Sequence, residues 1–400
     1  MADLARAVVR RAASRIRSGT LVVDGAAGGW TAGAGGPVVR LAVHDDRAYA
    51  ALVRHGSEGL AQTYADGWWD ADDLTALIRM LVDSLATPIG WLDHWGRLAN
   101  RPWQWWAGPR SDPAQDRSNV RAHYDLAPEL FGAMLDETLS YSCGVFEPAD
   151  ASLVEAQTTK LDRICAKLDL RPTDHLLEIG TGWGGLAMHA ARRFGCQVTT
   201  TTISARQFDE ASRRVVDAGL ADRVRVLDCD YRQLTGTYDK LVSVEMIEAV
   251  GWRQYNQFFA TCARLLRPEG LMVLQAIVIA DRSYERAKRR DDFIRRTIFP
   301  GSCLPSTTAI VDSLTRATPL RLFDLEDIGR HYAETLRQWN DNLWAHADQL
   351  ASVRLDERFR RLWQFYLCYC EAGFLERHIS DVQMVLAGPR YRPALTTRRQ

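Results

Sequence analysis

The chain has 400 residues, of which 46% are hydrophobic and 25% are charged, a composition that excludes general disorder and collagen-like repeats. Fifty Lys and Arg residues balance fifty Asp and Glu residues, so the chain has no overall basic field and we predict no nucleic-acid partner. No apolar run approaches the roughly 18–20 residues that span a bilayer, so we expect a soluble protein.

Residues 1–115 are predicted to form a smaller, mostly helical domain that contacts lipid, a membrane surface or a second copy of the chain. An apolar residue recurs at helical spacing among arginines, at Leu4, Val8, Ala12 and Ile16. A basic amphipathic helix of this kind either lies on an anionic membrane or is a solvated surface helix of its domain. Eight of the thirteen tryptophans fall in the first 110 residues, where they either meet a lipid interface or pack the domain and its boundary.

From residue 150 the sequence alternates between helical and strand-like patterns, which predicts parallel strands joined by crossover helices. The predicted strands are 175–180, 196–203, 223–230, 240–246 and 271–280, and the predicted helices are 152–168, 186–195, 204–219 and 253–266. Helical patterns then fill about 281–378, and a last strand, 381–388, is expected to close the sheet. We therefore predict an α/β domain over 116–400, with helices on both faces of its sheet and a helical lid insertion.

The eight cysteines are scattered through the chain without CxxC or Cys/His finger spacing. This pattern argues against a disulfide scaffold and against structural zinc. We predict free thiols in a reducing cytoplasm and no metal site.

Three glycines, Gly180, Gly182 and Gly185, form GxGxxG between a predicted strand and a predicted helix. A dinucleotide site expects an acidic residue about 20 residues further on, at the end of the second strand. Here that strand ends in the threonine run 199–202, and the acidic residue, Glu178, precedes the loop instead. The pattern favours S-adenosylmethionine over NAD, and a glycine turn that binds nothing is the remaining alternative.

Other polar residues follow the predicted parallel strands, where ligands of open α/β sheets bind. They are Thr202, Ile203 and Gln207 after the second strand, Asp230 and Tyr231 after the third, and Glu245 and Glu248 after the fourth. Each could singly be a cap or a turn residue, and Asp230 is most open to that interpretation. Their convergence on one edge of the sheet predicts a binding site there.

Several segments together resemble the cyclopropane fatty acid synthases. They are YSCGVF (141–146), LLEIGTGWGGLAMHAA (176–191), TTISARQ (201–207), CDYRQL (229–234), VSVEMIEAVG (242–251), IFPGSCLPS (298–306), HYAETLRQW (331–339) and CEAGF (370–374). The resemblance runs from about 115 to 390 and is looser before that, where GLAQTYADGWWDADDL (59–74) is also similar. It implies a Rossmann-like class I methyltransferase fold that uses S-adenosylmethionine to modify unsaturated acyl chains of phospholipids. It also implies a cytoplasmic enzyme, peripheral at the inner membrane surface, and a possible homodimer.

The resemblance also implies site residues. A bicarbonate ion would be held by Cys143, Glu248, Tyr332 and the backbone of Ile277, and Gln275 stands where well-known members have a histidine. Glutamine can donate a hydrogen bond to an anion, but it cannot shuttle a proton. The methyl donor would be bound by Tyr141, Ser142, Gly180, Gly182, Thr202, Ile203, Gln207, Asp230 and Tyr231. Cys370 matches a cysteine proposed as catalytic, although a thiol in an apolar helix is usually a core residue.

The expected reaction starts when the alkene attacks the sulfonium methyl and leaves a carbocation on the neighbouring carbon. A base must then remove a proton from the new methyl group as the ring closes, in a pocket that excludes water. Candidate rings for stabilising the cation are Phe146, Tyr332, Trp339 and Phe365. Three alternatives stay open: a methylene- or methyl-branched product, a lipid-binding or regulatory protein without turnover, and an oxidoreductase. The basic run 286–296 is either a membrane contact or a solvated helix face.

Overall fold

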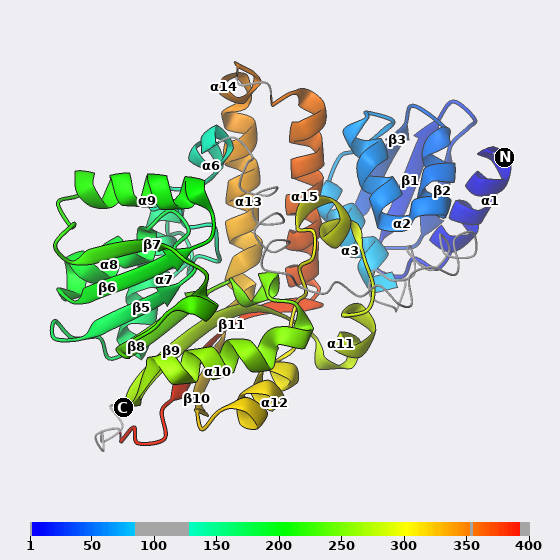
Figure 1. The fold of residues 1–400 in the computed structure, drawn as a ribbon. Coiled ribbons are helices and arrows are strands. Elements are labelled where there is room, and N and C mark those ends of the chain that lie inside the picture. Colours follow the sequence, from blue (N-terminus) through cyan, green and yellow to red (C-terminus); the bar gives the residue numbers. More distant parts are fainter. Residues whose placement is uncertain (1, 85–127, 353–354, 393–400) are drawn as a thin grey trace.

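The structure is a computed structural model that describes residues 2–84, 128–352 and 355–392. In Figure 1 the large sheet lies on one side, the N-terminal region on the other, and two long helices, α13 (Gly329–Ala345) and α15 (Glu357–Leu375), stand between them. The Trp-rich run 91–106 and the predicted domain boundary at residue 115 lie outside the described residues. No helix in the described part of the chain combines the length and apolar character needed to cross a bilayer.

The large sheet has seven described strands in the order β10-β11-β9-β8-β5-β6-β7. They are β5 (His175–Ile179), β6 (Gln197–Thr202), β7 (Val224–Asp228), β8 (Tyr238–Val244), β9 (Leu266–Ile279), β10 (Arg321–Asp327) and β11 (Ile379–Ala387). Strands β5 to β9 pair in parallel, β11 runs antiparallel to β9, and β10 runs antiparallel to β11. The predicted α/β fold of the class I methyltransferases is confirmed.

Helices cover both faces of this sheet, as predicted. The crossover helices are α8 (Gly185–Phe194), α9 (Ala205–Asp217) and α10 (Tyr255–Leu265), and α7 (Leu153–Lys167) precedes the first strand, β5. Successive residues of a strand point to opposite faces: Leu176 packs in one core with α7 and α8, and Leu177 packs in another with α10. Local sequence fixes where α7 begins, because Ser152 and Glu155 form a capping box.

The insertion after Asp281 is mainly helical but also contains a strand that the sequence analysis missed. Its helices are α11 (Asp281–Ala287), a π-helical segment (Ile294–Ile298), α12 (Thr307–Ala317), α13, α14 (Ala347–Ser352) and α15. Strand β10 forms the sheet edge, so β11 lies inside the sheet instead of closing it, which corrects the expectation for 381–388. The side chains of β10 are mostly exposed, so this strand has no buried apolar face to reveal it.

The N-terminal region contains a four-stranded sheet in addition to the expected helices. Its elements are α1 (Ala2–Ala13), β1 (Thr20–Gly25), β2 (Trp30–Gly33), β3 (Val38–Val43), α2 (Arg47–Ala65), β4 (Trp69–Ala71) and α3 (Leu74–Ser84), with strand order β2-β1-β3-β4. Three residues of the predicted apolar stripe, Val8, Ala12 and Ile16, border a cavity of about 110 Å³ inside this region, whereas Leu4 is 73% exposed. Helix α1 therefore covers its own domain with most of that stripe.

The N-terminal region packs against α15 through α2 and α3 (Figure 1). The Tyr64 hydroxyl donates to Gln364 Oε1 at 2.7 Å, and the Thr75 hydroxyl donates to Glu371 Oε2 at 2.8 Å. Arg361 pairs with Asp70 at 2.7 Å. The same helix carries residues that line the large cavity described next, so the N-terminal region supports one of its walls.

Candidate active site

A cavity of about 500 Å³ opens at the carboxyl ends of β5, β6 and β8 and extends to α13 and α15. Most of the predicted site residues line it: Tyr141, Ser142, Glu178, Gly180, Gly182, Thr202, Ile203, Gln207, Asp230, Tyr231, Glu248, Ile277, Tyr332 and Cys370. Two predicted residues, Cys143 and Gln275, are fully buried and are not among the lining residues. The volume is in the range of small-molecule and cofactor sites.

The glycine turn between β5 and α8 borders the cavity, and its backbone explains why glycine is used. Gly180 and Gly182 have φ values of 101° and 52°, in the left-handed region that disfavours other residues. A Cβ atom on Gly182 would meet no atom within 4 Å, so the space above this residue is open. A Cβ atom on Gly185 would lie 2.6 Å from the Thr138 backbone oxygen, so that glycine allows close packing instead.

Glu178 lies at the end of β5 and is only 3% exposed. Its Oε2 accepts a hydrogen bond from the Thr200 hydroxyl at 2.6 Å, and burial raises the pKa of the carboxyl to about 8. Thr200 belongs to the threonine run that ends β6. The threonine run therefore supplies a hydrogen-bond donor to a buried carboxyl group.

Two further pairs of bonded side chains lie on the side of the cavity where the methyl donor is expected to bind. The Thr202 hydroxyl donates to Gln207 Oε1 at 2.8 Å, which joins the end of β6 to the start of α9. Asp230 caps the short helix Tyr231–Gln233 and pairs with Arg232 at 2.6 Å. The carboxylate of Asp230 is thus already engaged as a cap, and its contact with a donor stays a prediction.

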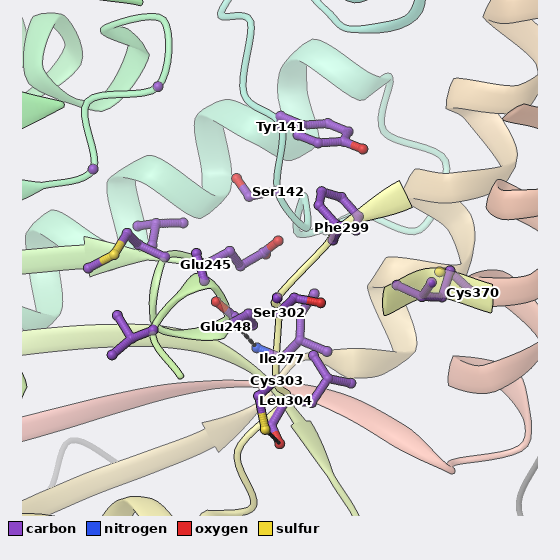
Figure 2. Close-up of a pocket in the computed structure, with 18 of the residues that line it drawn as sticks. Tyr141, Ser142, Glu245, Glu248, Ile277, Phe299, Ser302, Cys303, Leu304 and Cys370 are labelled. Atoms are coloured by element: carbon purple, nitrogen blue, oxygen red, sulfur yellow. Dashed lines mark hydrogen bonds between the residues drawn. The ribbon is translucent and has the colours of Figure 1, made fainter. Parts of the chain in front are cut away.

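The residues expected to surround bicarbonate lie together, but the three donors among them are bonded to Glu248, the fourth member of the set, and to Glu245. Ile277 N–H donates to Glu248 Oε1 at 2.5 Å (Figure 2). Cys143 N–H donates to Glu245 Oε1 at 2.9 Å, and the Tyr332 hydroxyl donates to Glu245 Oε2 at 2.5 Å. Sequence reasoning placed Glu245 at this edge of the sheet without giving it a role.

Gln275 lies behind the cavity wall and joins three acidic or amide side chains. Its Nε2 donates to Glu245 Oε1 at 2.8 Å and to Asp381 Oδ2 at 2.9 Å, and its Oε1 accepts from Gln383 Nε2 at 3.0 Å. Asp381 is fully buried, and its pKa is raised well above the usual range by burial and by the charge of Glu245. Glutamine at position 275 therefore holds a buried pair of carboxyl groups in place.

Lys160 is a functional candidate that sequence reasoning missed. It lies on the buried face of α7, is 2% exposed, and donates from Nζ to the Ser142 hydroxyl at 2.8 Å. Burial lowers its pKa, whereas Glu245 and Asp136 oppose that shift. The sequence signal that could have identified Lys160 was a lysine at a position of the predicted helix 152–168 that faces the sheet.

The wall formed by the helical insertion is largely aromatic and aliphatic. Its lining residues include Phe299, Leu336, Tyr366, Tyr369, Phe374 and Ile379, together with Tyr332 and Cys370. The other proposed cation-stabilising rings, Phe146, Trp339 and Phe365, are not among the lining residues. Burial raises the pKa of Cys370 well above that of a free thiol, so the thiol is neutral and its catalytic role stays a prediction.

The two buried glutamates predict a pH dependence of stability. Burial raises the pKa of both Glu178 and Glu248 to about 8 from the usual value of 4.5, so the folded state binds protons that the unfolded state releases between these values. The contribution of these two groups to the free energy of unfolding should therefore fall as pH rises from about 5 to about 8, by up to about 1.4 kcal/mol per pH unit for each group. Urea unfolding across this range checks this. The double variant Glu178→Gln/Glu248→Gln should lose less stability than wild type over this pH range, and an unchanged slope would contradict the assignment.

Comparisons with known proteins agree with this geometry. The family described as mycolic acid cyclopropane synthetase matches residues 111–384. The chain is 38% identical over 396 residues to tuberculostearic acid methyltransferase UfaA1 of Mycobacterium tuberculosis, covering 96% of this chain and 91% of the relative. It is 35% identical over 340 residues to cyclopropane-fatty-acyl-phospholipid synthase of Escherichia coli, covering 84% of each chain.

Solved structures give the same result. The cyclopropane synthase MmaA2 from Mycobacterium tuberculosis superimposes with a TM-score of 0.63 at 29% identity, covering 68% of this chain and 98% of that one. Mycolic acid cyclopropane synthase CmaA1, solved with SAH and CTAB, superimposes with a TM-score of 0.63 at 30% identity, covering 70% of this chain and 99% of that one. The chain therefore belongs to the mycolic acid cyclopropane synthetase family and is an S-adenosylmethionine-dependent methyltransferase.

Proposed function

We propose that this enzyme transfers a methylene group from S-adenosylmethionine to the cis double bond of an unsaturated phospholipid acyl chain, giving a cyclopropane fatty acid. The observation that carries the proposal is one cavity with three different walls. A glycine turn with open space lies on one side, an apolar wall lies on the other, and buried carboxyl groups lie between them. This arrangement suits an activated methyl, a hydrocarbon chain and a proton acceptor.

The residues present fit S-adenosylmethionine, which supplies an electrophilic methyl on a sulfonium when bound. The turn at Gly180 and Gly182 would admit the donor close to the backbone, and Thr202, Gln207 and Tyr141 would border it. The apolar wall that contains Phe299 and Phe374 would hold the alkene in line with the methyl and keep water away from the cation. Ser142 would be fixed for donor contact by its hydrogen bond from Lys160.

The residues present do not fit a separate bicarbonate ion. The donors that the resemblance assigns to it make hydrogen bonds to Glu245 and Glu248 in this structure. A further anion would add negative charge beside buried carboxyl groups whose pKa values burial already raises. No step of the proposed reaction is derived through bicarbonate.

The proposed substrate requires contact with a membrane surface, and the basic run 286–296 borders the cavity in a suitable place. Arg286, Lys288 and Arg290 are among the lining residues. Basic side chains that border the cavity would attract anionic head groups while the acyl chain enters the apolar side. This favours a cytoplasmic enzyme that binds peripherally at the inner membrane surface, and the homodimer stays a prediction.

A second product is favoured by a specific comparison. The relative that aligns with 96% of this chain is named a tuberculostearic acid methyltransferase, not a cyclopropane synthase. The same cation gives a methylene-branched chain if a hydride first shifts to the cationic carbon and the methyl group then loses a proton. A methyl-branched chain would need, in addition, a hydride donor.

A vesicle assay tests the proposed function. The purified protein is incubated with vesicles of cis-unsaturated phospholipid and methyl-¹³C S-adenosylmethionine, and the extracted lipid is analysed by NMR. We expect labelled lipid with high-field ring signals, and no label with fully saturated vesicles. Exomethylene signals without ring signals would establish the second product instead. Donor binding without any labelled lipid would overturn the proposal in favour of a binding protein.

A further inference from the structure

The carboxylate of Glu245 lies where three hydrogen-bond donors from distant parts of the chain converge. Cys143 N–H and Gln275 Nε2 donate to Oε1 at 2.9 and 2.8 Å, and the Tyr332 hydroxyl donates to Oε2 at 2.5 Å. Glu245 also lines the cavity, and Figure 2 shows its side chain on the same wall as Glu248. A carboxyl group of the protein itself thus already occupies this point.

We propose that the carboxylate of Glu245 takes the place of bicarbonate and accepts the proton in this enzyme, so that turnover needs no external bicarbonate. A carboxylate and a bicarbonate both present a planar, negatively charged pair of oxygens, so the same donors suit either one. The donors that the resemblance assigned to the ion include Cys143 and Tyr332, and both contact Glu245 here. The inference rests on the proposed function, because it names the base of that reaction.

The neighbouring charges allow Glu245 to be the ionised member of the cluster. Burial and the nearby Glu245 charge raise the pKa of Asp381 well above its usual range, and burial raises the pKa of Glu248 to about 8. Both groups are therefore largely protonated near neutral pH. Burial raises the pKa of Glu245 as well, but its three donors and the charge of Lys160 oppose the shift. A base with a raised pKa accepts a proton more readily at neutral pH.

The backbone gives independent support. Glu245 follows β8 with a φ of 47°, in the left-handed region that non-glycine residues adopt at a cost of order 1 kcal/mol. A glycine would adopt this conformation freely. A glutamate at this unfavourable backbone conformation is explained if its side chain has a function in the cavity.

The proton balance of the step is complete with groups already present. The alkene electron pair forms a bond to the methyl carbon while the C–S bond breaks and its electrons stay on sulfur. One C–H bond of the transferred methyl then breaks, and its electrons form the second ring bond to the cationic carbon. The proton passes to an oxygen of Glu245. The same carboxylate would take the methyl proton on the route to a methylene-branched product.

The experiment compares wild type with Glu245→Gly in the vesicle assay, in CO₂-free buffer and with added bicarbonate. Glycine suits the φ at this position, so the variant should fold, and its smaller side chain leaves room and free donors for a bicarbonate ion. In CO₂-free buffer we expect the variant to lose at least about 100-fold in turnover. Added bicarbonate should change the wild-type rate by less than about twofold and raise that of the variant by at least about tenfold. An equal response of the two proteins would overturn the proposal.

Bicarbonate binding supplies a readout that does not depend on turnover. Line broadening of ¹³C-bicarbonate should appear with Glu245→Gly loaded with S-adenosylhomocysteine, and should be absent with wild type loaded in the same way. Binding to wild type would overturn the inference while leaving the proposed function standing. Absence of labelled lipid from wild type under both conditions would instead count against the proposed function, and the binding comparison would still decide where the anion sits.

Discussion

Gly182→Val is expected to weaken binding of S-adenosylhomocysteine by at least about 100-fold, which corresponds to about 2.7 kcal/mol. Gly182 lines the cavity, and a Cβ atom there would point into open space with no protein atom within 4 Å. A valine side chain would fill the space through which the donor approaches the backbone. Its branched Cβ would also resist the φ of 52° at this residue. Isothermal titration calorimetry measures the change.

Gly219→Val is the matched control for this substitution. Gly219 has a φ of 67° and also has no atom within 4 Å of a Cβ position, but it lies in the turn after α9 and does not line the cavity. Both variants should therefore show a similar backbone strain. Only Gly182→Val should lose donor binding. Equal affinities in the two variants would contradict the assignment of the glycine turn.

The parts of the fold that could be predicted are those whose structure is determined by a short stretch of sequence. Gly180 and Gly182 mark their turn because the backbone there has positive φ. The alternating patterns after residue 150 mark β5 to β9 because buried parallel strands and crossover helices differ in period. Strand β10 could not be predicted, because its exposed edge position imposes no buried apolar face. The N-terminal strands are short, and β2 lies within the glycine-rich stretch 24–36, which by itself favours a loop.

The site could be predicted as a set of positions but not as a set of contacts. Glu245 and Glu248 follow β8, so both were expected at the carboxyl edge of the sheet. Which of them accepts from Tyr332 depends on α13, which is far away in the sequence. Lys160 was missed because a lysine in an amphipathic helix is normally exposed, and only the packing of α7 on the sheet shows that it is buried.

Glu248→Gln is expected to reduce kcat in the vesicle assay by at least about 100-fold, the size of effect seen when a group active in proton transfer is lost. Glu248 Oε1 accepts from Ile277 N–H, and its buried Oε2 has no hydrogen-bond partner among the described residues. In the variant, the amide oxygen would keep the bond to Ile277 and place an N–H₂ group at the Oε2 position. Unlike the carboxyl group that it replaces, this amide beside Glu245 can neither release nor take up a proton, so it could not exchange a proton with Glu245 during turnover. The affinity for S-adenosylhomocysteine should change by less than about threefold, because Glu248 acts on the reacting carbon rather than on the donor as a whole.

Glu371→Gln separates this effect from a general cost of neutralising an acid. Glu371 also has a pKa raised by burial and accepts from the Thr75 hydroxyl, but it faces the N-terminal region and does not line the cavity. It should keep near wild-type turnover, while Glu248→Gln should not. Wild-type kcat in Glu248→Gln would mean that this carboxyl plays no part in proton transfer. Loss of S-adenosylhomocysteine binding in the same variant would place Glu248 in the donor site instead, because a group that acts only on the reacting carbon leaves donor affinity unchanged.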